Sequence, residues 1–88
     1  MVFKNGRNCF FLDSPCRIHC QILPSLEGFK EIHVTTDTAA GTWTIAQFPI
    51  KQEQKEDEVI DRVHEFLTLA FISKARVKFE DLLSFIEK

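Results

Sequence analysis

A run of eight polar residues, Lys51 to Glu58, divides this chain into two halves of different character. Before this run, apolar and polar residues alternate in several segments, which is typical of strands that bury one face. From Glu56 onward Gly and Pro are absent, and apolar residues recur at three- and four-residue spacing, as in an amphipathic helix. Strands followed by helices within 88 residues predict one α+β domain over residues 1–88, with a β-rich half (1–50) and a helical half (56–88).

The helical half predicts a long helix over about residues 56–73 and a short helix over about residues 79–87. The apolar stripe of the long helix consists of Val59, Ile60, Val63, Phe66, Leu67, Ala70 and Phe71. Acidic residues crowd the start of this helix and basic residues follow its end, which is the arrangement that a helix dipole favours. Residues 74–79 alternate between polar and apolar, so the sequence allows either a short extended segment there or a long helix that continues to about Arg76.

The β-rich half predicts an antiparallel meander of three to four strands. The strands are expected over about residues 8–12, 16–22, 29–36 and 42–50, with turns at 13–15, 24–28 and 38–41. Asn5-Gly6 is a dipeptide that favours a type I′ hairpin turn, but residues 1–4 leave little strand before it. An alternative for residues 16–23 is a short helix with Ser14 as its N-cap and Pro15 as its first residue.

The faces of the sheet follow from the length of the loop between the last two strands. A four-residue loop at 38–41 places the apolar residues of both strands on one face, whereas a five-residue loop would divide them between the core and water. With the four-residue loop, the face that packs against the helices is predicted to contain Cys16, Ile18, Cys20, Ile22, Ile32, Val34, Trp43 and Ile45.

The opposite face of the sheet is predicted to stay open and to carry the function. Its polar, mostly short side chains are Arg17, His19, Gln21, Glu31, His33, Thr35, Thr42 and Thr44, together with Ala46. Three large apolar residues are expected near one edge of this face, and exposed aromatic residues beside a flat sheet often mark an interface. We therefore predict a binding surface formed by Phe29, Phe48, Ile50, His19, His33, Glu31 and Arg17.

These features predict a small binding protein that associates with another protein or with itself, and not an enzyme. A two-fold homodimer through Phe29, Phe48 and Ile50 is expected, because a domain of this size has a modest core of its own and two-fold dimers are the commonest oligomers. The alternative is that residues 2–12 or the short C-terminal helix cover this apolar patch within one chain.

Composition limits the classes of partner and the location. A hydrophobic fraction of 44% with nine Phe argues for a folded chain, and a net charge of −2 gives no electrostatic basis for binding nucleic acid. The longest apolar stretch, residues 66–72, is too short to span a membrane. Three cysteines, an odd number, and the lack of an apolar signal segment at the start predict a soluble cytoplasmic protein with reduced thiols.

Two other functions are open alternatives. Pairing of the second and third predicted strands sets His19 opposite His33 with Glu31 nearby, and two imidazoles with a carboxylate can hold zinc in an open catalytic geometry, as in a metal-dependent or small-molecule enzyme. The acidic residues within 53–61 suggest an inhibitor that mimics nucleic acid. No Gly-rich phosphate loop is present in the sequence, and no cofactor is expected.

Overall fold

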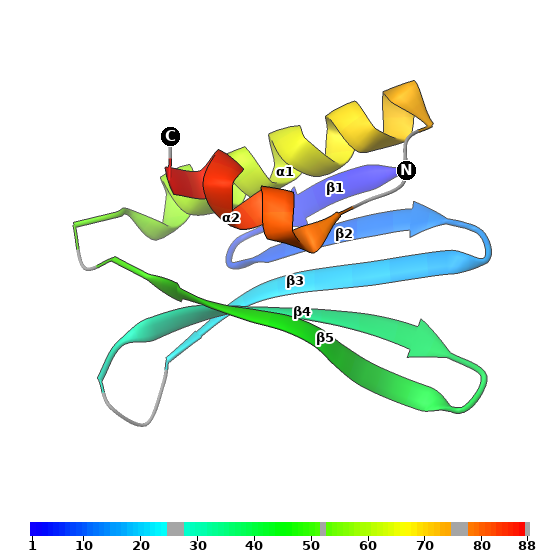
Figure 1. The fold of residues 1–88 in the computed structure, drawn as a ribbon, viewed down its shortest axis with the longest axis horizontal. Helices are drawn as coiled ribbons and strands as arrows, with labels where there is room; N and C mark the ends of the chain where they lie inside the picture. The colour runs from blue at the N-terminus through cyan, green and yellow to red at the C-terminus, as the bar shows by residue number, and fades with distance from the viewer. Residues whose placement is uncertain (25–27, 52, 75–77, 88) are drawn as a thin grey trace.

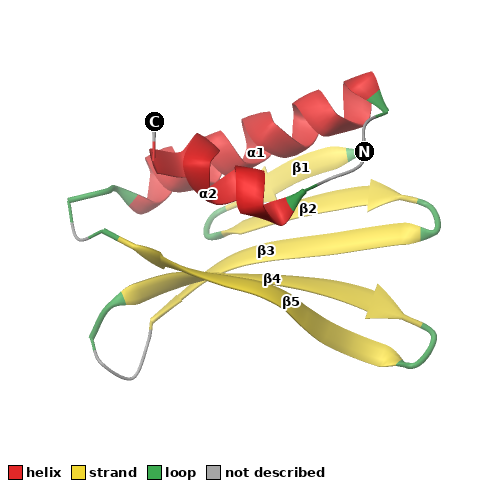
Figure 2. Ribbon diagram, viewed as in Figure 1, coloured by secondary structure: helices red, strands yellow, loops and turns green. Residues whose placement is uncertain are grey.

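Five antiparallel strands form one sheet, and both helices pack on the same face of it (Figures 1 and 2). The computed structural model describes residues 1–24, 28–51, 53–74 and 78–87, so the predicted loop residues 25–27 and the alternating residues 75–77 lie outside it. The elements are β1 (Val2–Asn5), β2 (Asn8–Asp13), β3 (Cys16–Pro24), β4 (Lys30–Thr38), β5 (Gly41–Ile50), α1 (Glu56–Ser73) and α2 (Phe79–Glu87). Each strand pairs with its neighbour in the sequence, which confirms the α+β meander, but with five strands rather than three to four.

The additional strand is β1, and the position of the first turn explains it. Asn5 pairs with Asn8, so the connection consists of Gly6 and Arg7, and Asn5 belongs to the strand. Gly6 has φ of +60°, whereas Lys74 is the sole residue other than glycine with positive φ in the described part of the chain. A two-residue hairpin with positive φ at its first central residue is a type II′ turn, which glycine favours at that position. Four residues therefore suffice for a strand where little strand was expected.

The segment after the second turn is a strand, as its two-residue alternation predicts, and the helical alternative is wrong. Ser14 and Pro15, joined by a cis peptide bond, connect β2 to β3. Within β3, Ile18, Cys20 and Ile22 are buried and Arg17 is exposed. Strand β3 therefore presents one apolar face to the helices and one polar face to the other side.

The pairing of β4 with β5 changes register at a β-bulge. Near the turn Asp37 pairs with Thr42, as the four-residue loop predicts. Thr35 then pairs with Thr44 but Val34 pairs with Ala46, which leaves Ile45 as an extra residue in β5. Because one extra residue moves all following side chains to the other face, the second half of β5 is reversed relative to the prediction.

This bulge corrects the predicted positions of Ala46, Phe48 and Ile50. Ile50 is 5% exposed and Phe48 packs against the core, so both lie on the helix side and not on the open face. Ile45, the extra residue, is 43% exposed although it was predicted in the core. Trp43 was also predicted in the core and is 56% exposed, but it lies before the bulge and pairs with Thr36 in the predicted register, so the bulge is not the cause. The bulge thus buries the apolar residues at the end of β5 that lie closest to the helices.

The core lies between the sheet and the two helices. Helix α1 packs over β1 and β2 and against α2, and contributes Val59, Ile60, Val63 and Leu67. Helix α2 adds Leu82 and Ile86. Helix α1 ends at Ser73, where Lys74 caps it in the left-handed conformation and donates its backbone N–H to carbonyls of the last turn. The predicted alternative, a helix that continues to about Arg76, falls on residues outside the described part of the chain. Neither helix, within the residues described, is long and apolar enough to cross a membrane.

Candidate functional site

Three rings stand side by side on the face of the sheet opposite to the helices. Phe3 of β1, Phe10 of β2 and His19 of β3 occupy directly paired positions. The ring centroids of Phe3 and Phe10 are 4.9 Å apart at an interplanar angle of 24°, and those of Phe10 and His19 are 4.5 Å apart at 6°. These separations match the ~4.8 Å distance between neighbouring strands, so the rings stack across the sheet as an aromatic row. We call Phe3, Phe10 and His19 the aromatic row.

The sequence prediction contained His19 but missed the two phenylalanines of the row. Phe3 was missed because β1 was not expected, and Phe10 because the facing of β2 was not assigned. The signal that was available is the alternation in Asn8 to Leu12, where Cys9 and Phe11 are buried and Phe10 faces the other way. Pairing this strand with β3 would have placed Phe10 next to His19.

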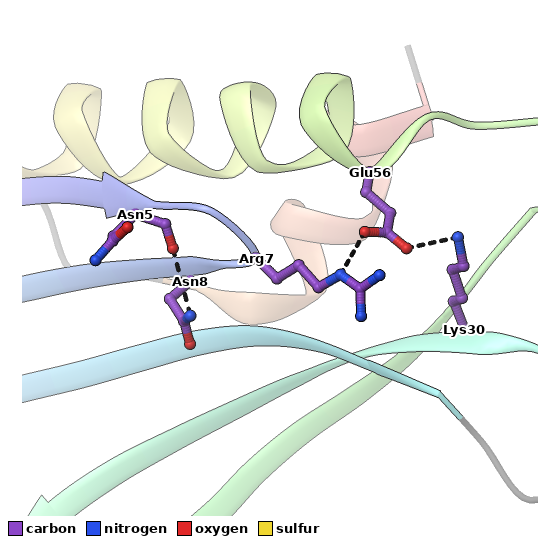
Figure 3. A network of polar contacts seen from close by, with 5 residues as sticks. All are labelled: Asn5, Arg7, Asn8, Lys30 and Glu56. Carbon is purple, nitrogen blue, oxygen red and sulfur yellow. Dashed lines mark hydrogen bonds and ion pairs between the residues drawn. The ribbon is translucent and has the colours of Figure 1, made fainter.

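A chain of hydrogen bonds fixes the protonation of His19. Its Nε2 lies 2.8 Å from Asn8 Oδ1, and Asn8 Nδ2 donates to the Asn5 carbonyl at 3.3 Å (Figure 3 shows the bond between Asn8 and Asn5). Because the Asn8 amide nitrogen is engaged with Asn5, its oxygen accepts from His19, and Nε2 carries the proton. In the neutral ring Nδ1 then holds a lone pair and can accept a hydrogen bond.

The neutral form of His19 is favoured at neutral pH. Burial of the ring lowers the pKa of His19, and the carboxylate of Asp37 opposes that shift only in part. His19 is therefore an uncharged aromatic ring with one acceptor nitrogen.

A pocket of about 320 Å³ opens beside the aromatic row toward the turn between β4 and β5. Its lining includes Phe10, Arg17, His19, Thr35, Asp37 and Thr42. The β3–β4 register, continued one step beyond the pair of Ile18 and Thr36, sets Arg17 opposite Asp37. Asp37 Oδ1 accepts a hydrogen bond from Thr42 Oγ1 at 2.7 Å, whereas Arg17 forms no ion pair with any residue that the structure describes. Two opposite charges on neighbouring strands thus line the pocket without an ion pair between them.

The predicted histidine pair does not form. His19 is paired with Thr35, and His33 is paired with Gln21, so the prediction that the two histidines lie opposite each other is wrong. The actual register is displaced by two residues, because it pairs Ile22 with Ile32 at the apolar end of both strands. A two-residue displacement leaves every side chain on its predicted face and changes only its neighbour across the strands.

His33 has separate partners on the open face. Its Nε2 lies 3.6 Å from Glu31 Oε2 and 3.2 Å from Gln47 Nε2. Among the residues described, no group of three His, Cys, Asp or Glu side chains is arranged to hold a metal ion. His19 and His33 therefore take part in two separate sets of polar contacts on the open face, and Glu31 belongs to the set of His33.

The predicted apolar patch of Phe29, Phe48 and Ile50 is divided by the bulge. Phe29, directly before β4, is exposed. Phe29 and Ile50 line a hollow of about 100 Å³ next to Gln54, at the end of the sheet where α1 begins. Phe48 lies against the core, so these three residues do not form one surface on the open face.

The acidic start of α1 is partly neutralised by the strands. Glu56 bridges Arg7 at 2.6 Å and Lys30 at 2.5 Å, and Lys4 pairs with Asp61 (Figure 3 shows the contacts of Glu56). The hydrogen bond from Lys30 and the charge of Arg7 hold the pKa of the Glu56 carboxyl below its ordinary value, against the opposing effect of burial. Two of the carboxylates that a nucleic-acid mimic would present are thus engaged within the protein.

The three cysteines differ in their surroundings. Cys9 and Cys20 are paired across β2 and β3 and are fully buried. Cys16 was predicted on the core face but is exposed, because it lies at the start of β3 beside the turn. Burial raises the pKa of Cys9 to about 11 and that of Cys20 to about 12. Since the thiolate is the reactive form, these two thiols are inert parts of the core.

Comparison with protein-family models, with curated proteins and with solved structures finds no match for this chain.

Proposed function

We propose that this protein is a binding module that holds another protein on the open face of its sheet. The observation that supports this proposal is the aromatic row with its adjoining pocket, on a face that neither helix covers in the described part of the chain. Aromatic residues and arginine are the side chains most enriched in protein interfaces, and the face presents both. The helices hold the other face of the sheet in the core, so the open face is available without unfolding.

The charge of the open face favours a protein over a nucleic acid. On the described strands, this face carries Arg17 as its one permanent positive charge, and Glu31 and Asp37 as negative charges. Binding of a phosphate backbone requires several cations that replace counterions. Stacked rings without surrounding cations are better suited to an uncharged or mixed-charge protein surface.

Self-association is the second candidate form of this function. Arg17 and Asp37 have opposite charges and lie side by side on the same face. In a two-fold dimer each of them would meet the opposite charge of the second copy. Light scattering at about 100 μM distinguishes the two forms, because a stable dimer would be fully associated at that concentration.

The test of the proposed function is a comparison of two charge reversals on opposite sides of the molecule. Arg17→Glu changes the open face, and Glu65→Arg changes an exposed position on α1. Each variant is immobilised and exposed to an extract of the native host, and the proteins retained by the wild type are quantified. We expect Arg17→Glu to reduce the retained partner at least about tenfold and Glu65→Arg to leave it unchanged. Equal retention by both variants, or a wild type that retains nothing and is monomeric, would refute the proposal.

A further inference from the structure

The aromatic row ends beside a vacant position that has room for another ring. After Phe3, Phe10 and His19, the next paired positions on β4 and β5 are Thr35 and Thr44, which have short side chains. A planar ring above Thr35 would lie one strand spacing from His19, at the ~4.8 Å separation that the row already has. The face of the His19 ring that Phe10 does not cover would then become part of a four-ring stack.

The pocket is of the right size for one aromatic side chain. Its volume of about 320 Å³ lies at the lower end of ligand-binding pockets, which range over ~300–1,000 Å³. Stacked aromatic pairs stabilise an interface beyond the area that they bury, and such rings serve as anchors when they fill a pocket. The pocket therefore has room for one anchoring ring.

The polar groups at the edge of the pocket specify the substituent of that ring. Asp37 accepts hydrogen bonds, and Arg17 across from it donates them. A phenol hydroxyl donates one hydrogen bond and accepts others, so it can bridge the two charges; an indole N–H can only donate, and a phenyl ring can do neither. From the hydrogen-bonding groups of Asp37 and Arg17 we propose that the pocket is a recognition site for a tyrosine side chain of a partner protein.

This inference rests on the proposed function and specifies which side chain of the partner enters the pocket. The chain itself contains no Tyr, so a second copy of the same chain cannot supply the hydroxyl-bearing ring. The occupant of the pocket must come from a different protein. Self-association through the open face would leave this pocket unfilled by tyrosine.

The site can be tested with a single capped amino acid. ¹⁵N-labelled protein is titrated with N-acetyl-tyrosinamide up to about 20 mM, since one ring is expected to bind in the millimolar range. We expect the largest shifts at the amides of His19, Thr35 and Asp37, and binding of N-acetyl-phenylalaninamide that is about tenfold weaker, because the phenyl ring leaves the charged pair unbridged. Uridine is the third probe, and tighter binding of uridine would overturn the inference in favour of a nucleobase.

Three variants make the result specific. Thr35→Phe fills the slot with a ring of the chain itself and should abolish binding of the tyrosine probe. Asp37→Asn should reduce the preference for tyrosine over phenylalanine from about tenfold toward unity. Gln21→Ala, on the same face outside the pocket lining, should bind like the wild type, and the dispersion of each amide spectrum verifies that the variant is folded.

The outcomes of the two experiments distinguish a failure of the tyrosine site from a failure of the proposed function. No shift at the pocket, or equal binding of the tyrosine and phenylalanine probes, overturns the inference even if Arg17→Glu abolishes partner retention. Selective binding of the tyrosine probe together with unchanged retention by Arg17→Glu supports the pocket and refutes the open face as the interface.

Discussion

The two faces of the sheet are formed by the same strands but differ in how deeply their side chains are buried. On the covered face, Cys9, Cys20 and Val34 are fully buried and pack against the helices. On the open face, the neighbouring residues Phe10, His19 and Thr35 are only half-buried and form the aromatic row and its pocket. Because side chains alternate along each strand, the buried side chains that stabilise the fold lie on one face. Side chains on the other face can be replaced with little loss of stability. The difference shows that the side chains of the open face contribute little to the core of this chain.

The largest expected effect comes from a cavity on the covered side. Leu67 of α1 is 0% exposed, whereas Leu69, two residues along the same helix, is 53% exposed. Leu67→Ala should lower the free energy of unfolding by roughly 2 to 5 kcal/mol, because it removes buried methyl groups and leaves a void. Leu69→Ala should change it by less than about 0.5 kcal/mol. Chemical denaturation measures both, and equal losses would contradict the assignment of the helix face.

A charge placed on either side of the bulge tests the reversal of β5. Phe48→Glu introduces a carboxylate against the core, and Ile45→Glu introduces one at an exposed position. We expect Phe48→Glu to destabilise the protein by roughly 1 to 3 kcal/mol through desolvation, and Ile45→Glu to have a much smaller effect. Thermal melts compare the two variants. If Phe48→Glu instead gave a stable monomer from a wild-type dimer, the residue would lie on an exposed interface.

The buried thiols predict a loss of stability at alkaline pH. The folded pKa values of Cys9 and Cys20 lie at about 11 and about 12, above the ordinary value of 9.0, so the unfolded chain releases protons first as the pH rises. The stabilisation is complete below pH 9 and is lost as the pH rises through the folded pKa values. At pH 10 each thiol should account for roughly 1.4 kcal/mol of the loss. Denaturant melts of the wild type and of Cys20→Ala between pH 8 and 10 should show a smaller loss in the variant.

The smallest expected effect is the titration of His19 on the open face. Its NMR midpoint should lie below the ordinary value of 6.5, because burial disfavours the charged ring. Asp37→Asn should lower the midpoint further, since the carboxylate is the group that favours the cation. The associated stability is present above pH 6.5 and declines as the pH falls through the folded pKa. A midpoint that rises in Asp37→Asn would mean that the two side chains do not interact as the structure places them.

Much of the fold could be predicted from periodicity alone. The bounds of α1 and α2 agree with the predicted ranges, because the apolar spacing changes phase between Ser73 and Phe79. In β5 the spacing of Trp43 and Ile45 also changes phase before Phe48. This change of phase is the sequence signal of the bulge, although it also fits the apolar patch that the sequence predicts on the open face.

The candidate site was less predictable, for a physical reason. Alternation tells which face a side chain occupies, but a two-residue displacement between strands preserves the faces and changes every cross-strand neighbour. The pair of His19 with Thr35, and the position of Arg17 opposite Asp37, depend on that displacement. The residues that line the pocket are therefore brought together by the register between strands. The sequence pattern of a single strand does not determine that register.

The contacts of Glu56 have a consequence for which face remains open. A meander of neighbouring strands is almost symmetric between its two sides, and a helix that follows the last strand can fold back over either of them. Glu56, the first residue of α1, meets Arg7 from the first turn and Lys30 from the start of β4, and thus ties the beginning of the helix to two distant points on the same side. Together with the apolar stripe, these three charges select the side on which the helix lies. The face of the sheet that stays uncovered is therefore determined in part by contacts on the opposite face.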